Sequence, residues 1–161
     1  MGTRADFYKE TPDGLFWIAS IGWDGYPEGI YTKDEDENGV VTTQYITDCE
    51  DEERYLAFLA DLLSPRDDVT YPQQGWPWPW ANSLLTDYAY VFSNDRKEVL
   101  IANFGRGWFN QKEWEELEDL PDEMWKNLAR VDNFPDMTDQ MKVTFDKRSG
   151  LLILESRGKN E

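Results

Sequence analysis

An acidic run near residue 34 has the spacing of a calcium-binding loop. Asp34, Asp36 and Asn38 place oxygen ligands at alternate positions, and Gly39 follows where such a loop turns sharply. The twelfth position holds Tyr45, where a calcium loop needs a bidentate glutamate, and no helix pattern flanks the run. The sequence therefore favours a solvated hairpin turn, with a Ca²⁺ site as the alternative.

The side chains that most enzymes use are scarce in this chain. It contains no histidine, which removes the usual general base and every Ser-His or Cys-His nucleophile pair. Its single cysteine, Cys49, lies between Asp48 and Glu50, whose charges disfavour a reactive thiolate. P-loop, dinucleotide and CxxC motifs are also missing. We therefore expect that the protein is not an enzyme and binds no cofactor. The alternative is a metal-dependent hydrolase that would use Asp34 or Asp36.

Aromatic residues gather in loops that are rich in glycine and proline. In Gly75–Trp80 each proline fixes its own φ and favours extended geometry in the residue before it, so the three tryptophans sit on a stiff segment. Together with two arginines, such rings could bind a nucleotide or a cyclic dinucleotide by stacking and ion pairing. The alternative is that the indoles close the core. The candidate ligand-binding residues are Arg4, Trp23, Tyr26, Trp76, Trp78, Trp80, Asp87, Arg106 and Trp108.

Acidic residues outnumber basic ones by 33 to 16, and the formal net charge is -17. This charge argues against binding nucleic acid through its phosphates and favours a basic partner protein. The acids form two blocks that could present carboxylates much as a DNA duplex presents phosphates; the alternative is a surface that only promotes solubility. The candidate partner-binding residues are Asp34, Glu35, Asp36, Glu37, Glu50, Asp51, Glu52 and Glu53, followed by Glu113, Glu115, Glu116, Glu118 and Asp119.

Hydrophobic patterning predicts the elements that position these residues. A short mixed segment at 3–8 and an acidic turn at 33–39 accompany predicted strands at 15–21, 40–46, 88–92, 99–104, 142–145 and 151–154. A helix is predicted from a cap at Asp48 to Ser64-Pro65, with an apolar stripe along one side. A second begins after Asn110, and Pro121 opens a further helical turn. The pattern indicates an α+β fold, an antiparallel sheet with two helices packed on one face.

The chain is most simply one domain over residues 1–161, with 158–161 as a disordered tail. We expect a cytoplasmic protein, because the chain has no signal-like start, no long apolar run and no second cysteine for a disulfide.

Five motifs carry a resemblance to a known group of proteins. They are Gly2–Tyr8, Ile18–Ile21 with Trp23–Pro27, Gly75–Trp80, Thr86–Tyr90 and Phe104–Phe109. The chain resembles a family of uncharacterised small proteins from bacteria, prophages and phages, over roughly its first two thirds. The resemblance suggests a phage-linked protein. Together with the charge pattern, it favours an inhibitor of a basic, nucleic-acid-handling host defence protein, with DNA mimicry as one form of that inhibition. The alternative is a small-molecule binder that sequesters a nucleotide through its Trp-rich loops.

Overall fold

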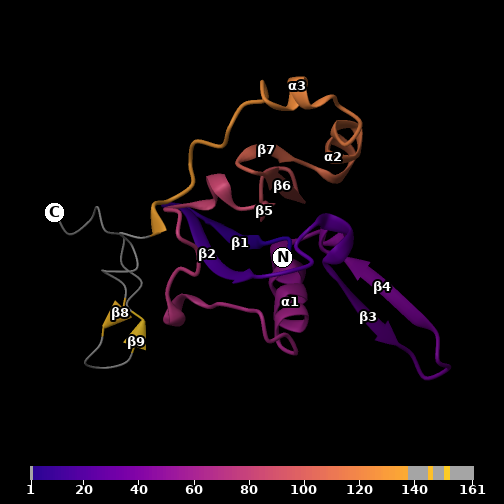
Figure 1. Cartoon of the computed structure of the whole chain (residues 1–161). Helices are drawn as coiled ribbons and strands as arrows, with labels where there is room; N and C mark the ends of the chain where they lie inside the picture. The colour runs from indigo at the N-terminus through magenta and orange to yellow at the C-terminus, as the bar shows by residue number, and fades with distance from the viewer. Residues whose placement is uncertain (1, 138–144, 147–150, 153–161) are drawn as a thin grey trace.

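The computed structural model describes residues 2–137, 145–146 and 151–152 (Figure 1). Its centre is a five-stranded sheet in the order β2-β1-β5-β6-β7. The strands are β1 (Ala5–Thr11), β2 (Gly14–Ile21), β5 (Tyr88–Ser93), β6 (Glu98–Asn103) and β7 (Arg106–Phe109). The predicted α+β class is confirmed. The sheet is mixed rather than wholly antiparallel, because the adjacent strands β1 and β5 run parallel.

Two helices pack on one face of this sheet, as predicted. Helix α1 (Glu52–Leu63) begins after Asp51, whose carboxylate accepts from the backbone N–H of Arg54 at 2.7 Å. Helix α2 (Gln111–Leu117) begins after Asn110 with a reciprocal capping box to Glu113. The apolar stripe of α1 and Trp114 of α2 bury against one side of the strands. The cap of α1 is three residues later than predicted, because Ile46–Asp48 forms a separate 3-10 turn.

The opposite face of the sheet has an irregular cover. Alternate strand residues such as Tyr8, Trp17 and Val91 point to this side and are buried. They pack under Gly75–Trp80, which we call the Trp-Pro segment, and under residues 131–137 instead of under helices. Burial on both faces explains why the strands read as nearly continuous apolar runs. Short 3-10 turns punctuate the connecting loops at Pro27–Gly29, Pro72–Gln74 and Ser83–Leu85.

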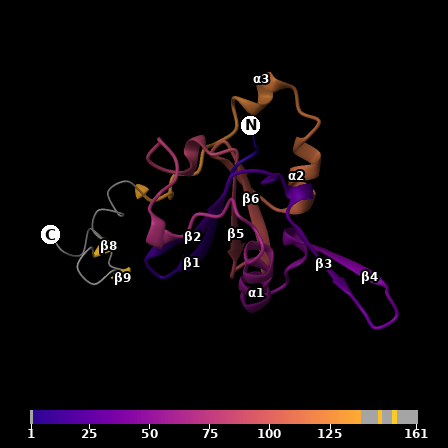
Figure 2. The ribbon, with the colours of Figure 1, turned by 60° about the horizontal axis from the view of Figure 1, so that its bottom comes forward.

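A two-stranded arm, β3 (Tyr31–Glu35) and β4 (Val41–Tyr45), projects from the body of the protein in both ribbon views (Figures 1 and 2). The predicted strand at 40–46 is confirmed as one side of this hairpin. The predicted turn at 33–39 is shorter than expected, since β3 continues through Glu35. The arm of five paired positions is about 17 Å long at about 3.4 Å per residue.

The C-terminal third contains short elements. Strand β7 was not predicted, and helix α3 (Asp122–Trp125) follows Pro121 as expected. Strands β8 (Phe145–Asp146) and β9 (Leu151–Leu152) pair antiparallel where the last hairpin was predicted. The rest of that hairpin and the predicted tail at 158–161 lie outside the described residues. None of the described helices has the length and apolar character that a membrane span requires.

Candidate functional site

A buried carboxylate organises the irregular face of the sheet. Asp6 of β1 is fully buried, and its Oδ1 accepts hydrogen bonds from Ser20 Oγ at 2.5 Å and from Trp78 Nε1 at 2.8 Å. Its Oδ2 accepts from Ser83 Oγ at 2.5 Å. Burial raises the pKa of Asp6, while the hydrogen bonds from Ser20, Ser83 and Trp78 act in the opposite direction. Three segments distant in sequence therefore meet at one side chain.

This hydrogen-bond network extends to two further aromatic residues. Trp17 Nε1 donates to Ser20 Oγ at 2.9 Å, and the hydroxyls of Tyr8 and Ser83 lie 2.5 Å apart. Burial, with the nearby charge of Asp6, raises the pKa of Tyr8 well above its ordinary value. Every polar group in this network has a protein partner, which is the arrangement expected of a structural core.

The indoles of the Trp-Pro segment are tied to the protein itself. Trp76 Nε1 donates to the backbone oxygen of Trp80 at 2.6 Å, and Trp80 Nε1 donates to Thr86 Oγ1 at 2.9 Å. With the bond from Trp78 to Asp6, all three N–H donors are used internally. All three side chains are half-buried. The segment closes the core, which is one of the two alternatives that the sequence left open.

Four of the candidate ligand-binding residues do come together. The rings of Trp78 and Trp80 stack with centroids 5.9 Å apart, and the guanidinium of Arg4 lies 5.4 and 5.5 Å from their centroids. Asp87 Oδ2 accepts from the backbone N–H of Arg4 at 2.8 Å and lies 4.0 Å from its guanidinium. The chain's own arginine thus occupies the place over these rings where a ligand cation would stack.

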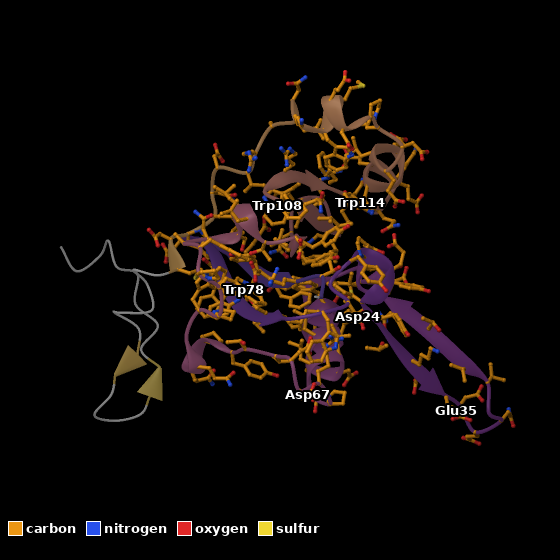
Figure 3. The ribbon with its side chains drawn as sticks, in the orientation of Figure 1. Asp24, Glu35, Asp67, Trp78, Trp108 and Trp114 are labelled. Atoms are coloured by element: carbon orange, nitrogen blue, oxygen red, sulfur yellow. The ribbon has the colours of Figure 1, made fainter. Side chains whose placement is uncertain are left out.

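The other candidate ligand residues lie elsewhere. Trp23 and Tyr26 belong to the loop before Pro27–Gly29 and are 47% and 39% exposed. Trp108 packs edge-on against Phe134, with ring centroids 5.4 Å apart. Arg106 is half-buried, and its Nε has no hydrogen-bond partner among the described residues. In Figure 3, Trp78, Trp108 and Asp24, which is the neighbour of Trp23 in the chain, lie at three separate places, so the nine residues do not form one ligand site.

The β5–β6 turn brings the two acidic helix starts together. Asn94 Nδ2 donates to Glu52 Oε2 at 3.1 Å, and Arg96 lies 3.2 Å from Glu113 Oε1. Both partners belong to one tight turn, so the N-terminal ends of α1 and α2 flank the same turn. The backbone N–H of Asn110 and the guanidinium of Arg96 lower the pKa of Glu113, so it stays ionised.

Carboxylates are also crowded at the far end of α2. The pKa of Glu118 is raised by burial and then by the charges of Glu28, Asp119 and Glu115. Among the described residues, Glu115, Glu116, Glu118 and Asp119 form no ion pair with a basic side chain. We call the following residues the acidic helical surface: Glu50, Asp51, Glu52, Glu53, Glu113, Glu115, Glu116, Glu118 and Asp119.

The remaining acidic candidates lie on the β3–β4 arm, with Asp34 and Glu35 in β3 and Asp36 and Glu37 in the turn at its tip. Glu35 projects far from the sheet in Figure 3, so Asp34–Glu37 does not join Glu50–Glu53 in one block. Asp36 Oδ1 accepts from the backbone N–H groups of Asn38 and Val40, each at 2.9 Å, and Gly39 adopts φ 79°. The candidate calcium run therefore forms a hydrogen-bonded hairpin turn. In the described ranges, no three acidic or cysteine side chains are placed to hold a metal ion together.

Cys49 is buried, and desolvation with the charges of Asp48 and Asp51 raises its pKa to about 11. The thiol therefore stays protonated at neutral pH.

Sequence reasoning missed Asp6, Ser20 and Ser83. The one available signal was an acid between apolar residues in Ala5–Tyr8, within a strand whose two faces are buried.

No family model, curated protein or solved structure matches this chain.

Proposed function

We propose that this chain is a binding protein whose acidic helical surface docks on a basic protein that handles nucleic acid, and that it inhibits this partner by occupying the site for DNA. The observation that carries the proposal is that the starts of α1 and α2 both contact the β5–β6 turn, through the side chains of Glu52 and Glu113. Two acidic stretches that lie about sixty residues apart in the sequence thus begin on either side of one turn.

The chemistry of this surface suits a basic groove. Carboxylates such as Glu115 and Glu116 are exposed and form no ion pair among the described residues, so a partner's arginines and lysines could bind them directly. The crowding around Glu118 is relieved when cations approach, which adds to the favourable energy of binding. The resemblance to phage and prophage proteins supports a host defence protein as the partner, by analogy.

Affinity capture from a bacterial lysate tests this proposal. The tagged chain is compared with Glu115→Gln/Glu116→Gln on the acidic helical surface and with a remote variant, Asp13→Asn/Asp132→Asn, which changes the net charge equally at two exposed acids outside that surface. We expect the wild type and the remote variant to recover a nucleic-acid-handling protein at moderate salt, and the helical variant to recover much less. Recovery of no such protein, or equal recovery by all three chains, would contradict the proposal.

A further inference from the structure

A groove of about 850 Å³, open to solvent, lies where the β3–β4 arm leaves the body of the protein. One wall is the start of β3, a second is the loop Asp24–Gly29, and the third is the end of α1 with Asp61 and Arg66. Sites that bind ligands in proteins commonly measure about 300–1,000 Å³. Because this one is open, its shape suits side chains of a bound segment better than an enclosed small molecule.

The charge of the groove is negative. Its carboxylates come from the loop, the arm and the helix: Asp24, Glu28, Asp34 and Asp61. Two basic residues, Lys33 and Arg66, also line it, but Arg66 is already engaged. Its Nε and one terminal nitrogen each lie 2.8 Å from Asp68, and that nitrogen also donates to the backbone oxygen of Trp23 at 2.7 Å. Arg66 therefore fixes the wall through Asp68 and Trp23; the charge of Asp24 also acts on it, but among the described residues Arg66 forms no ion pair with a groove carboxylate.

Exposed aromatic rings accompany these carboxylates. Tyr26 and Tyr31 both line the groove and are each 39% exposed. The ammonium of the exposed Lys33 lies 5.5 Å from the centroid of the Tyr31 ring, and a partner's guanidinium would replace it on this face. Tyrosine faces beside carboxylates are the combination that binds guanidinium and ammonium groups, through cation–π contacts and charged hydrogen bonds.

The loop wall is held rigidly by the sheet beneath it. Gly25 donates its N–H to the backbone oxygen of Thr3 at 2.9 Å, and its own oxygen accepts from the Tyr90 hydroxyl at 2.6 Å. A Cβ atom on Gly25 would stand 2.7 Å from the Cβ of Ala5, so only glycine allows this close approach. A wall fixed before binding loses little conformational entropy when a ligand arrives.

We infer that this groove binds arginine and lysine side chains of a basic segment of the partner protein. The inference rests on the proposed function and adds a specific pocket to it. The carboxylates are spread along three walls, and within the described part of the chain no three of them gather as ligands of one metal ion. Such spacing fits successive cationic side chains, each paired with a carboxylate and covered by a tyrosine ring.

A fluorescent oligo-arginine peptide serves as the probe, with binding measured by anisotropy at about 0.1 M salt, where the Debye length is about 10 Å. The groove variant Asp24→Asn/Asp61→Asn removes two carboxylates from opposite walls, and asparagine tolerates the positive φ of 59° at position 24. We expect the groove variant to bind about tenfold more weakly, the loss expected for two ion pairs. The remote variant Asp13→Asn/Asp132→Asn should stay within about twofold of the wild type, because neither residue lines the groove and salt screens distant charges.

A second variant, Tyr31→Thr, leaves the net charge unchanged and keeps a strand-forming residue in the arm. It should also weaken binding, by about threefold, because it removes the ring that covers the cation. Circular dichroism and thermal melting establish that each variant is folded. If the groove variant binds like the remote variant, the groove inference is wrong. The variant Glu115→Gln/Glu116→Gln separates the two proposals. If it alone weakens binding, the acidic helical surface binds the peptide and the groove does not. If no variant differs from the remote one, both proposals are wrong.

Discussion

The buried carboxylate of Asp6 accepts a hydrogen bond from the indole of Trp78 at 2.8 Å, across 72 positions of the chain. This contact holds the Trp-Pro segment against the sheet. It also occupies the indole N–H of Trp78, which is then not available to bind a ligand. The two faces of the sheet therefore differ in role. One is closed by the Trp-Pro segment, whose three indole donors are satisfied, while the other carries two helices with exposed carboxylates.

Removal of the Asp6 carboxylate should destabilise the protein strongly. Asp6→Ala leaves the donors of Ser20, Ser83 and Trp78 without their acceptor in a buried site. We expect a loss of about 3–5 kcal/mol in the free energy of unfolding, because each unsatisfied buried donor costs about 1–3 kcal/mol. Asp6→Asn keeps one oxygen acceptor and should cost less. Urea unfolding measures both, and a loss below about 1 kcal/mol for the alanine variant would show that the network is not structural.

The same side chain gives a pH dependence. Burial raises the pKa of folded Asp6 above its ordinary value of 3.8, so the folded protein binds this proton more tightly than the unfolded chain. Its contribution to stability is therefore complete below pH 3.8 and is lost as pH rises through the raised pKa. The difference in unfolding free energy between wild type and Asp6→Asn should fall over that window. Since the other acids are common to both proteins, a difference independent of pH would contradict the assignment.

Fluorescence quenching should identify a single dominant exposed tryptophan. Trp23 is 47% exposed, whereas Trp17 and Trp114 are 4% and 5% exposed and the three indoles of the Trp-Pro segment are half-buried. Trp23→Phe should therefore remove more of the acrylamide-quenchable emission than Trp76→Phe does. Nucleotides and cyclic dinucleotides should leave the quenching unchanged, because Arg4 already covers Trp78 and Trp80. Protection by one nucleotide would favour the sequestration hypothesis instead.

Carboxylate crowding on α2 should reduce stability while serving binding. Glu118→Gln removes a charge that Glu28, Asp119 and Glu115 repel. We expect a small gain in stability, a few tenths of a kcal/mol after solvent screening, together with weaker partner capture. Thermal melting at low and high salt measures the gain, which should shrink at high salt. A loss of stability in this variant would mean that Glu118 has a structural role.

Local signals in the sequence predicted most of the elements. The apolar stripe of α1 and the cap at Asn110 act within a few residues, so their helices were predictable. Strand β7 was missed because Gly105 precedes it and Gly107 lies within it, and two closely spaced glycines indicate a turn in the sequence. Both adopt positive φ in the structure. The parallel pairing of β1 with β5 was also missed, since it joins segments more than eighty residues apart.

The candidate sites were predictable only in part. The acidic blocks are visible as composition, but the contacts of Glu52 with Asn94 and of Glu113 with Arg96 depend on the tertiary fold. The groove could not be predicted either, because Asp61 looks like any exposed acid on a helix until the arm is placed beside it.

Competition with DNA tests the central claim most directly. The nucleic-acid-handling protein captured from lysate is bound to labelled duplex DNA, and the chain is titrated into the complex while the DNA is followed by gel mobility or anisotropy. We expect the wild type to release the DNA, the variant Glu115→Gln/Glu116→Gln to require several-fold more protein for the same release, and added salt to weaken the effect. A stable complex of all three components, or equal release by the helical variant, would contradict the central claim.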